Sequence, residues 1–357
     1  MSRRYNIFIS ILAIAAAVSC TKSDIVGSMS TSTEIGFETY LGRDAQTKAT
    51  VETTATLQNG GRIGIYGIYT GAKMWDGKTE TNLLIDEELS YDKTKSAWTY
   101  TNTAFWTNDK DYYSFLAYAP HGNSAVSASQ PAGKAPQLVY EVPGSLGSQV
   151  DIVYSNENQN TTKAACTKNG VTAVPILLQH ALSRISVKAN AVMYNETGGV
   201  FVPGVDEEYG NIFTVTNISI KGPFKTVGTF DLVAGDWIAT TTTENTTYDL
   251  NGNVTKALEA EYYDFSANSN YLMIIPADFT TTKAKLAVTY TVTYLGMPSG
   301  EITKEVEIAE NFEIGKAYSI NLTFQRDSNN PITFKVNSLS QWEDQEINTP
   351  TSPVANS

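Results

Sequence analysis

Apolar and polar residues alternate along much of the chain, and this period of two is typical of strands with one buried face. The clearest run lies between residues 285 and 294, where the apolar positions are Leu286, Val288, Tyr290, Val292 and Tyr294. A second run covers Tyr318 to Phe324. No long segment has a helical period, and turn residues recur about every 8–12 positions. We therefore predict an all-β protein with two tandem antiparallel β-sandwich domains.

Changes in composition set the predicted domain boundaries. A stretch rich in glycine, proline and acidic residues follows residue 195, and a Thr/Asn-rich run at 240–247 is predicted as a surface loop. The predicted organisation is a signal peptide at 1–19, a tether at 20–33, an N-terminal sandwich domain at 34–195, a C-terminal sandwich domain at 196–347 and a polar tail at 348–357.

The first strand candidate precedes a polar segment with two basic residues. This strand spans residues 34–41, and its apolar face consists of Ile35, Phe37 and Leu41. The polar segment after it contains Arg43 and Lys48 in a setting where proteases cut. This polar segment is therefore a candidate for proteolytic cleavage.

The last strand candidate lies close to the C-terminus. Its apolar residues are Ile332, Phe334 and Val336, followed by Leu339 and Trp342. From the alternation alone, this segment is predicted to be the final strand of its own domain.

The N-terminus has the features of a bacterial export signal. Arg3 and Arg4 precede an apolar run at 7–18, which is shorter than the about 20 residues that a membrane-spanning helix needs. Small residues directly before Cys20 resemble a lipobox, and this resemblance implies cleavage before Cys20 and lipid on its thiol. An ordinary signal peptide with an incidental cysteine is the alternative. Several acyl chains would anchor the protein without a transmembrane helix.

Lipid on Cys20 would leave Cys166 as a single thiol. Cys166 lies in a polar, turn-like stretch with no histidine near it in the sequence. A nucleophilic role would therefore require His121 or His180 to approach it in the fold. We predict that Cys166 has no catalytic role.

Composition excludes several classes of function. The chain has 25 Lys+Arg and 37 Asp+Glu, and its net charge of −12 argues against nucleic acid as a partner. Two histidines and two cysteines cannot build a His-rich metal centre, and we expect no cofactor. Hydrophobic residues make up 41% of the chain, which is enough for a large core.

We find no catalytic motif and predict that the protein is not an enzyme. The acidic triplets Asp86-Glu87-Glu88 and Asp206-Glu207-Glu208 offer the paired carboxylates of a glycosidase, but acidic runs in loops are usually solvated surface. Glycan binding without polymerisation is the main alternative function. Its aromatic platform would come from Trp75, Trp98, Trp106, Trp237 and Trp342. Aromatic residues in sandwiches more commonly pack in the core.

A series of short motifs follows one order along nearly the whole mature chain. The motifs are Ile35-Gly36-Phe37, Ile63-Gly64-Ile65-Tyr66-Gly67, Phe105-Trp106, Tyr113-Ser114-Phe115-Leu116-Ala117-Tyr118-Ala119-Pro120, Asp151-Ile152-Val153-Tyr154-Ser155, His180-Ala181-Leu182-Ser183-Arg184-Ile185, Tyr271-Leu272-Met273-Ile274-Ile275-Pro276, Gly315-Lys316-Ala317-Tyr318 and Trp342. Together with the lipobox cysteine, this order resembles the fimbrillin family of Bacteroides-type bacteria, the lipoprotein precursors of pilins.

The resemblance implies two transthyretin-like β-sandwich domains and a structural or adhesive role in a fimbrium at the cell surface. It implies export as an outer-membrane lipoprotein. The implied partners are other fimbrial subunits, the outer membrane through the N-terminal lipid, and a receptor on a host or bacterial surface.

The resemblance also implies a route of assembly. In polymerising members, a protease cuts after a basic residue beyond the first strand, which here would be Arg43 or, less typically, Lys48. The excised strand would carry Ile35, Phe37 and Leu41. A strand from a neighbouring subunit would fill the groove, and the C-terminal segment 332–342 is the candidate donor.

Overall fold

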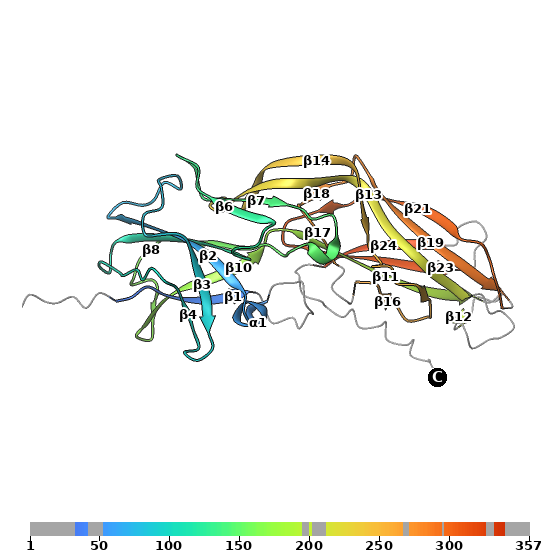
Figure 1. Ribbon diagram of the computed structural model, residues 1–357, viewed down its shortest axis with the longest axis horizontal. Helices are drawn as coiled ribbons and strands as arrows, with labels where there is room; N and C mark the ends of the chain where they lie inside the picture. Colours follow the sequence, from blue (N-terminus) through green and yellow to red (C-terminus); the bar gives the residue numbers. More distant parts are fainter. Residues whose placement is uncertain are drawn as a thin grey trace, which may run out of the picture.

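The chain folds almost entirely into β-strands, which confirms the predicted all-β class. The computed structural model describes residues 33–41, 53–194, 200–201, 212–266, 271–294, 296–325 and 332–339. Within these ranges the only helical elements are α1 (Thr54–Gln58) and the 3-10 turn η1 (Leu146–Ser148). Figure 1 shows an elongated molecule with one group of strands towards each end and a third group between them.

The first sheet lies at the end of the molecule that contains the N-terminal strands (Figure 1). Its order is β1-β10-β8-β5-β2-β3-β4, with the short strand β9 paired to β10. The strands are β1 (Gly36–Leu41), β2 (Arg62–Gly71), β3 (Leu84–Asp92), β4 (Ala97–Thr99), β5 (Tyr112–Ala119), β8 (Val153–Thr161), β9 (Thr167–Lys168) and β10 (Val171–His180). Strand β1 is at the edge and runs parallel to β10, whereas the other pairs are antiparallel.

The second sheet is built around one parallel pair, β11 with β23. Its order is β12-β11-β23-β24, and β16 and β17 also pair with β11. The strands are β11 (Ser183–Tyr194), β12 (Val200–Phe201), β16 (Tyr263–Asp264), β17 (Leu272–Ile274), β23 (Ala317–Gln325) and β24 (Ile332–Leu339). Strand β24 is antiparallel to β23 and occupies the edge.

The third sheet is organised by β13 (Ile212–Asp231), a strand of 20 residues. Residues 212–221 of β13 pair with β19, and residues 227–231 pair with β7, so β13 links strands from distant parts of the chain. The other strands of this sheet are β6 (Val126–Ser129), β7 (Gln137–Glu141), β14 (Asp236–Asp249), β15 (Lys256–Ala257), β19 (Ala284–Tyr294), β20 (Met297–Pro298) and β21 (Ile302–Ile308). A separate pair joins β18 (Ala277–Asp278) to β22 (Asn311–Phe312).

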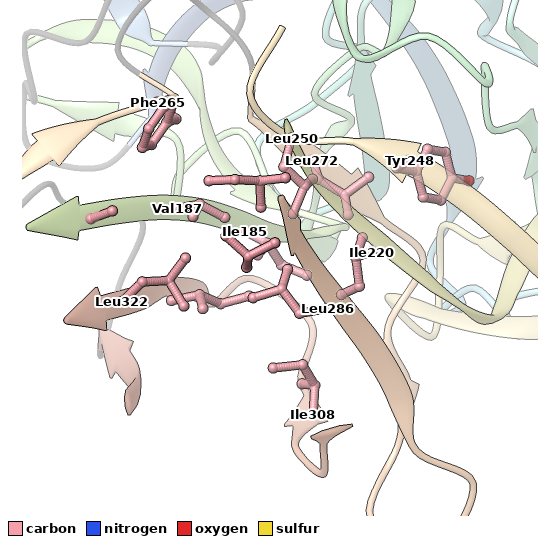
Figure 2. Close-up of a cluster of buried hydrophobic side chains, with 14 of the residues drawn as sticks. Ile185, Val187, Ile220, Tyr248, Leu250, Phe265, Leu272, Leu286, Ile308 and Leu322 are labelled. Carbon is pink, nitrogen blue, oxygen red and sulfur yellow. The ribbon is translucent and has the colours of Figure 1, made fainter. Parts of the chain in front are cut away.

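Buried apolar side chains form three clusters. The largest lies between the second and third sheets, and Figure 2 shows Ile185, Leu286 and Leu322 converging there from β11, β19 and β23. A second cluster fills the first sheet's inner side. The third contains Leu116 from β5, Phe230 from β13 and Met273 from β17, so it joins the two ends of the molecule through a shared core.

Several predicted elements can be compared with the structure. The alternating run at 285–294 is confirmed as β19. Strand β11 precedes the predicted boundary at 195 but pairs with β17 and β23, which follow it. The prediction of a loop at 240–247 is wrong, because these residues belong to β14 and pair with β13. Threonine is β-branched and suits an exposed strand, even without apolar alternation. The transthyretin-like description of two domains stays a prediction.

Candidate functional site

The segment that contains β1 is held by β10 on one side and, at its start only, by residues 104–106 on the other. On one side, β1 pairs in parallel with β10 from Gly36 opposite Ala173 to Leu41 opposite Leu178. On the other side, the Ile35 amide donates to the Ala104 carbonyl at 2.9 Å, and the Trp106 amide donates to the Thr33 carbonyl at 2.9 Å. The segment therefore bridges β10 and the connection that follows β4.

One face of this segment is buried in the second core cluster. Ile35, Phe37 and Leu41 are 0%, 5% and 5% exposed, which confirms the prediction that they share a buried face. The Phe37 ring packs edge-on against Tyr100 and Phe115, with centroid separations of 5.5 and 5.6 Å. Each such side chain contributes about 1.5–3 kcal/mol when fully buried. Removal of β1 would open an apolar channel in the core.

Thr39 occupies the same buried face but is polar. Thr39 is 5% exposed, and its hydroxyl has no hydrogen-bond partner among the residues that the structure describes. A buried hydroxyl without a partner costs about 1–3 kcal/mol. The segment 35–41 therefore buries three apolar side chains and one polar side chain that is unfavourable there.

Two hydroxyl groups form hydrogen bonds with the backbone at the two ends of segment 35–41. The Tyr100 hydroxyl donates to the Ile35 carbonyl at 2.7 Å, and burial raises the pKa of Tyr100. At the other end, the Leu41 amide donates to Thr54 Oγ1 at 3.0 Å, and that hydroxyl lies 3.4 Å from the Leu41 carbonyl. Thr54 is the first residue of α1, so the chain leaves β1 and returns at adjacent points.

The α1 turn that carries Thr54 is stabilised by its own sequence. Thr53 is the N-cap: its hydroxyl accepts from the Thr56 amide, while the Thr56 hydroxyl accepts from the Thr53 amide, which completes a capping box. Leu57 is 1% exposed and packs in the same core cluster as β1. The helix is thus held in place by its cap and by one buried side chain.

Several predicted site residues lie outside the described residues. These are Cys20, Arg43, Lys48 and Trp342. The candidate donor strand with Ile332, Phe334, Val336 and Leu339 is β24, and its backbone pairs with β23 of the same chain. The lipid site, the processing sites and the donor role remain predictions.

The tryptophans do not form the predicted platform within the described residues. Trp75, Trp98 and Trp106 are 6%, 8% and 2% exposed, so they pack in the core. The indole of Trp237 donates to the Ala181 carbonyl at 2.7 Å. These contacts favour the packing interpretation over glycan stacking.

The first acidic triplet serves structural contacts. The prediction that Asp86-Glu87-Glu88 lies in a loop is wrong, because the triplet is part of β3. Its carboxylates accept hydrogen bonds from Tyr118, Asn102 and Ser90, respectively. The triplet at 206–208 lies outside the described residues.

Cys166 is buried, and burial raises the pKa of its thiol. Its sulfur lies 3.4 Å from the Thr161 hydroxyl. The two histidines contact carboxylates: His180 Nδ1 lies 2.9 Å from Asp151 Oδ2, and His121 Nδ1 lies 3.3 Å from Glu88 Oε2. A raised pKa keeps the thiol protonated at neutral pH, which opposes a nucleophilic role.

Within the described ranges, no set of three or more His, Cys, Asp or Glu side chains is arranged to hold a metal ion. The helices of the described residues are too short to cross a bilayer.

Comparisons with known proteins give a consistent result. A family model described as fimbrillin-like matches residues 47–342. The fimbrium subunit Fim1C of Phocaeicola vulgatus is 24% identical over 216 residues, and the match covers 56% of each chain. This chain therefore spans about half the length of that curated relative.

Solved structures share the fold. A fimbrial protein from Bacteroides vulgatus is 22% identical with a TM-score of 0.68, covering 87% of this chain and 99% of that chain. A candidate cell adhesion protein from Bacteroides ovatus is 15% identical with a TM-score of 0.51, covering 87% of this chain and 98% of that chain.

Proposed function

Because the chain belongs to the fimbrillin-like family, we propose that it is a structural or adhesive fimbrial subunit that polymerises by strand exchange after losing its first strand. It is exported as a precursor with lipid on Cys20, which holds it at the outer membrane. A protease then cuts after Arg43 or Lys48. The other fimbrial subunits are its partners, and a surface receptor is the partner of an adhesive subunit.

The observation that carries this proposal is the position of β1. It is an edge strand whose neighbour β10 would be left with a row of unpaired backbone groups, a ready template for another strand. Its departure would also expose the channel that Ile35, Phe37 and Leu41 fill. A strand from a second subunit would restore both the hydrogen bonds and the apolar contacts.

The connection between β1 and α1 suits a cut that leaves the rest of the fold intact. Leu41 and Thr54 are hydrogen-bonded to each other, so the chain between them begins and ends at one place in the structure. A cut after Arg43 or Lys48 falls between β1 and α1 and therefore within neither element. It does break the covalent link between β1 and the remainder of the chain.

Strand β24 is the proposed donor. It lies at the edge of the second sheet, and its one partner strand there is β23. An edge strand near the C-terminus can leave its sheet without threading through the fold. Retention of β24 in its own domain is the alternative outcome.

The test of processing uses the double variant Arg43→Ala/Lys48→Ala in the full chain, expressed in a host that displays fimbriae of this family. We expect the variant to reach the surface with its first strand retained and to form no polymers on unboiled gels. N-terminal sequencing of the surface protein checks the cut: a start at Asp44 or Ala49 indicates processing, and a start at Cys20 indicates a retained lipoprotein.

Lys134→Ala is the matched control. Lys134 is an exposed basic residue in a turn of the first half of the chain. This variant should mature as the unmodified chain does. Normal polymers from the double variant would contradict the proposed route.

A further inference from the structure

Strands β1 and β24 carry the same short pattern, although they lie at opposite ends of the chain. The pattern is Ile35-Gly36-Phe37-Glu38-Thr39 in β1 and its approach, and Ile332-Thr333-Phe334-Lys335-Val336 in β24. Both place isoleucine first, phenylalanine third and a β-branched residue fifth. Because alternate residues of a strand share a face, these three positions form one face in each strand.

From this match we infer the register of the exchanged strand: β24 of a second copy lies parallel to β10, with Ile332, Phe334 and Val336 in the sites of Ile35, Phe37 and Thr39. The inference rests on the proposed function and specifies the register and the parallel orientation of its donor strand. It assigns each inward side chain of the donor to a site that the structure describes.

The Phe37 site fixes the register. Tyr100 and Phe115 form its walls and meet the ring edge-on, so the site is shaped for an aromatic ring. The donor segment 332–336 contains one aromatic residue, Phe334. A slip by one residue would place Thr333 or Lys335 in this site and turn the whole apolar face outwards.

The Thr39 site is the position at which the incoming strand has an advantage over the resident strand. The Thr39 hydroxyl is buried and has no partner among the described residues. Valine has nearly the same shape as threonine but carries no hydroxyl. Val336 would therefore fill the site without the unpaired polar group, so the incoming strand fits this position better than the resident strand.

The glycine in β1 is compatible with the donor. A Cβ atom on Gly36 would meet the Thr172 carbonyl at 3.6 Å, which is an ordinary contact. Thr333 of the donor can therefore occupy this position. The match ends at Leu41, whose counterpart in this register is Ser338.

The reverse direction fits less well. An antiparallel donor with Phe334 in the Phe37 site would bring Ile332 to the Thr39 site and Val336 to the Ile35 site. Isoleucine is larger than threonine and would overfill a buried position. Valine is smaller than Ile35, which is 0% exposed, and would leave a cavity.

Cysteine pairs test the register in the full chain. Tyr40 lies opposite Leu177 in the present pairing, so the inferred register puts Asn337 of the donor opposite Leu177. Leu177→Cys/Asn337→Cys should then form disulfides between subunits after mild oxidation of surface polymers. The expected readout is a ladder on boiled, non-reducing gels that collapses to monomer when a reductant is added.

Val171→Cys/Asn337→Cys is the matched control. Val171 and Leu177 are both exposed, at 62% and 40%, and both lie on β10. The antiparallel donor would bring Asn337 opposite Val171. Each single-cysteine variant controls for Cys166, and the amount of monomer at the surface shows that each variant folds.

The outcomes separate the register from the assembly route. A ladder from the Leu177 pair, at least several-fold stronger than from the Val171 pair, supports the inference. A ladder from the Val171 pair alone, or polymers that neither pair cross-links, overturns it while strand exchange by another register stands. Absence of polymers from the unmodified chain refutes the proposed function, and the register with it.

Discussion

The Tyr100 hydroxyl donates a 2.7 Å hydrogen bond to the carbonyl of Ile35, and this bond ties the connection after β4 to the start of the first strand. The same ring packs against Phe37 two residues further on. Tyr100 thus contacts the segment through both its polar and its apolar parts. Its ring lines the site that Phe37 occupies, and its hydroxyl holds the start of the strand by a hydrogen bond.

We predict that Tyr100→Phe destabilises the precursor by about 1 kcal/mol, because the buried Ile35 carbonyl loses its donor while the ring contacts remain. Denaturant unfolding of the uncut precursor measures this loss. Tyr91→Phe is the control, since the Tyr91 ring packs on Trp98 at the border of the same cluster. Equal unfolding midpoints for Tyr100→Phe and the unmodified chain would exclude a fastening role for this hydroxyl.

Thr39→Val should have the opposite effect on the free energy of unfolding. The change removes a buried hydroxyl without a described partner and keeps the shape of the side chain, so we expect a gain of about 1 kcal/mol. The stabilised β1 should also leave its site more slowly after the cut. Polymer formation by the Thr39→Val variant, followed over time on unboiled gels, measures the second effect.

Thr99→Val is the control for this prediction, and we expect it to change the free energy of unfolding in the opposite direction. The Thr99 hydroxyl donates to the Ser90 carbonyl at 3.2 Å, so its removal should lower the free energy of unfolding. If both valine variants were less stable than the unmodified chain, Thr39 would not be a mismatch in β1.

Phe37→Ala should destabilise the precursor by about 3–5 kcal/mol, because it removes a fully packed aromatic side chain and leaves a cavity. Tyr40→Ala on the outer face of the same strand is the control. Tyr40 is 49% exposed, and its hydroxyl contacts Glu38 on the surface, so its loss should cost far less. Comparable losses in the two variants would show that the inner face of β1 is not what holds the strand.

Alkaline pH should unfold the protein through its buried tyrosines. Burial raises the pKa of Tyr66 and of Tyr118, and the nearby Asp86 carboxylate adds to both shifts. Above pH ~10 the unfolded state loses these phenolic protons while the folded state keeps them. The stability that these groups contribute is therefore complete below pH ~10 and is lost as pH rises further.

Denaturant unfolding at several pH values measures this loss. We expect a slope of about −1.4 kcal/mol per pH unit for each such tyrosine. Tyr66→Phe should reduce the slope by one tyrosine's share. Its free energy of unfolding at neutral pH should change little. A slope that is unchanged in Tyr66→Phe would contradict the assignment.

The inner face of β1 could be predicted from the sequence because its three apolar residues alternate. The hydrogen bonds that hold the two ends of the segment could not be predicted, since Tyr100 lies 65 residues from Ile35 and Thr54 lies 13 residues from Leu41. Such contacts depend on tertiary packing rather than on local pattern. The parallel pairing of β1 with β10 is likewise a property of the whole sheet.

Strand β14 could not be recognised as a strand from its own sequence. Its residues 240–247 are polar and mostly exposed, so they lack the apolar alternation that identifies a half-buried strand. What makes them a strand is the ladder of hydrogen bonds to β13, which the sequence of β14 does not encode by itself. The exposed strand β14 is therefore one that the local pattern misses.

The length of β13 has a mechanical consequence for a subunit in a filament. One uninterrupted strand pairs with β19 towards one end of the molecule and with β7 towards the other (Figure 1). Tension along the long axis would load these two ladders in shear, so that many hydrogen bonds share the force. A subunit built in this way would transmit a pull from neighbour to neighbour with little stretch of its own.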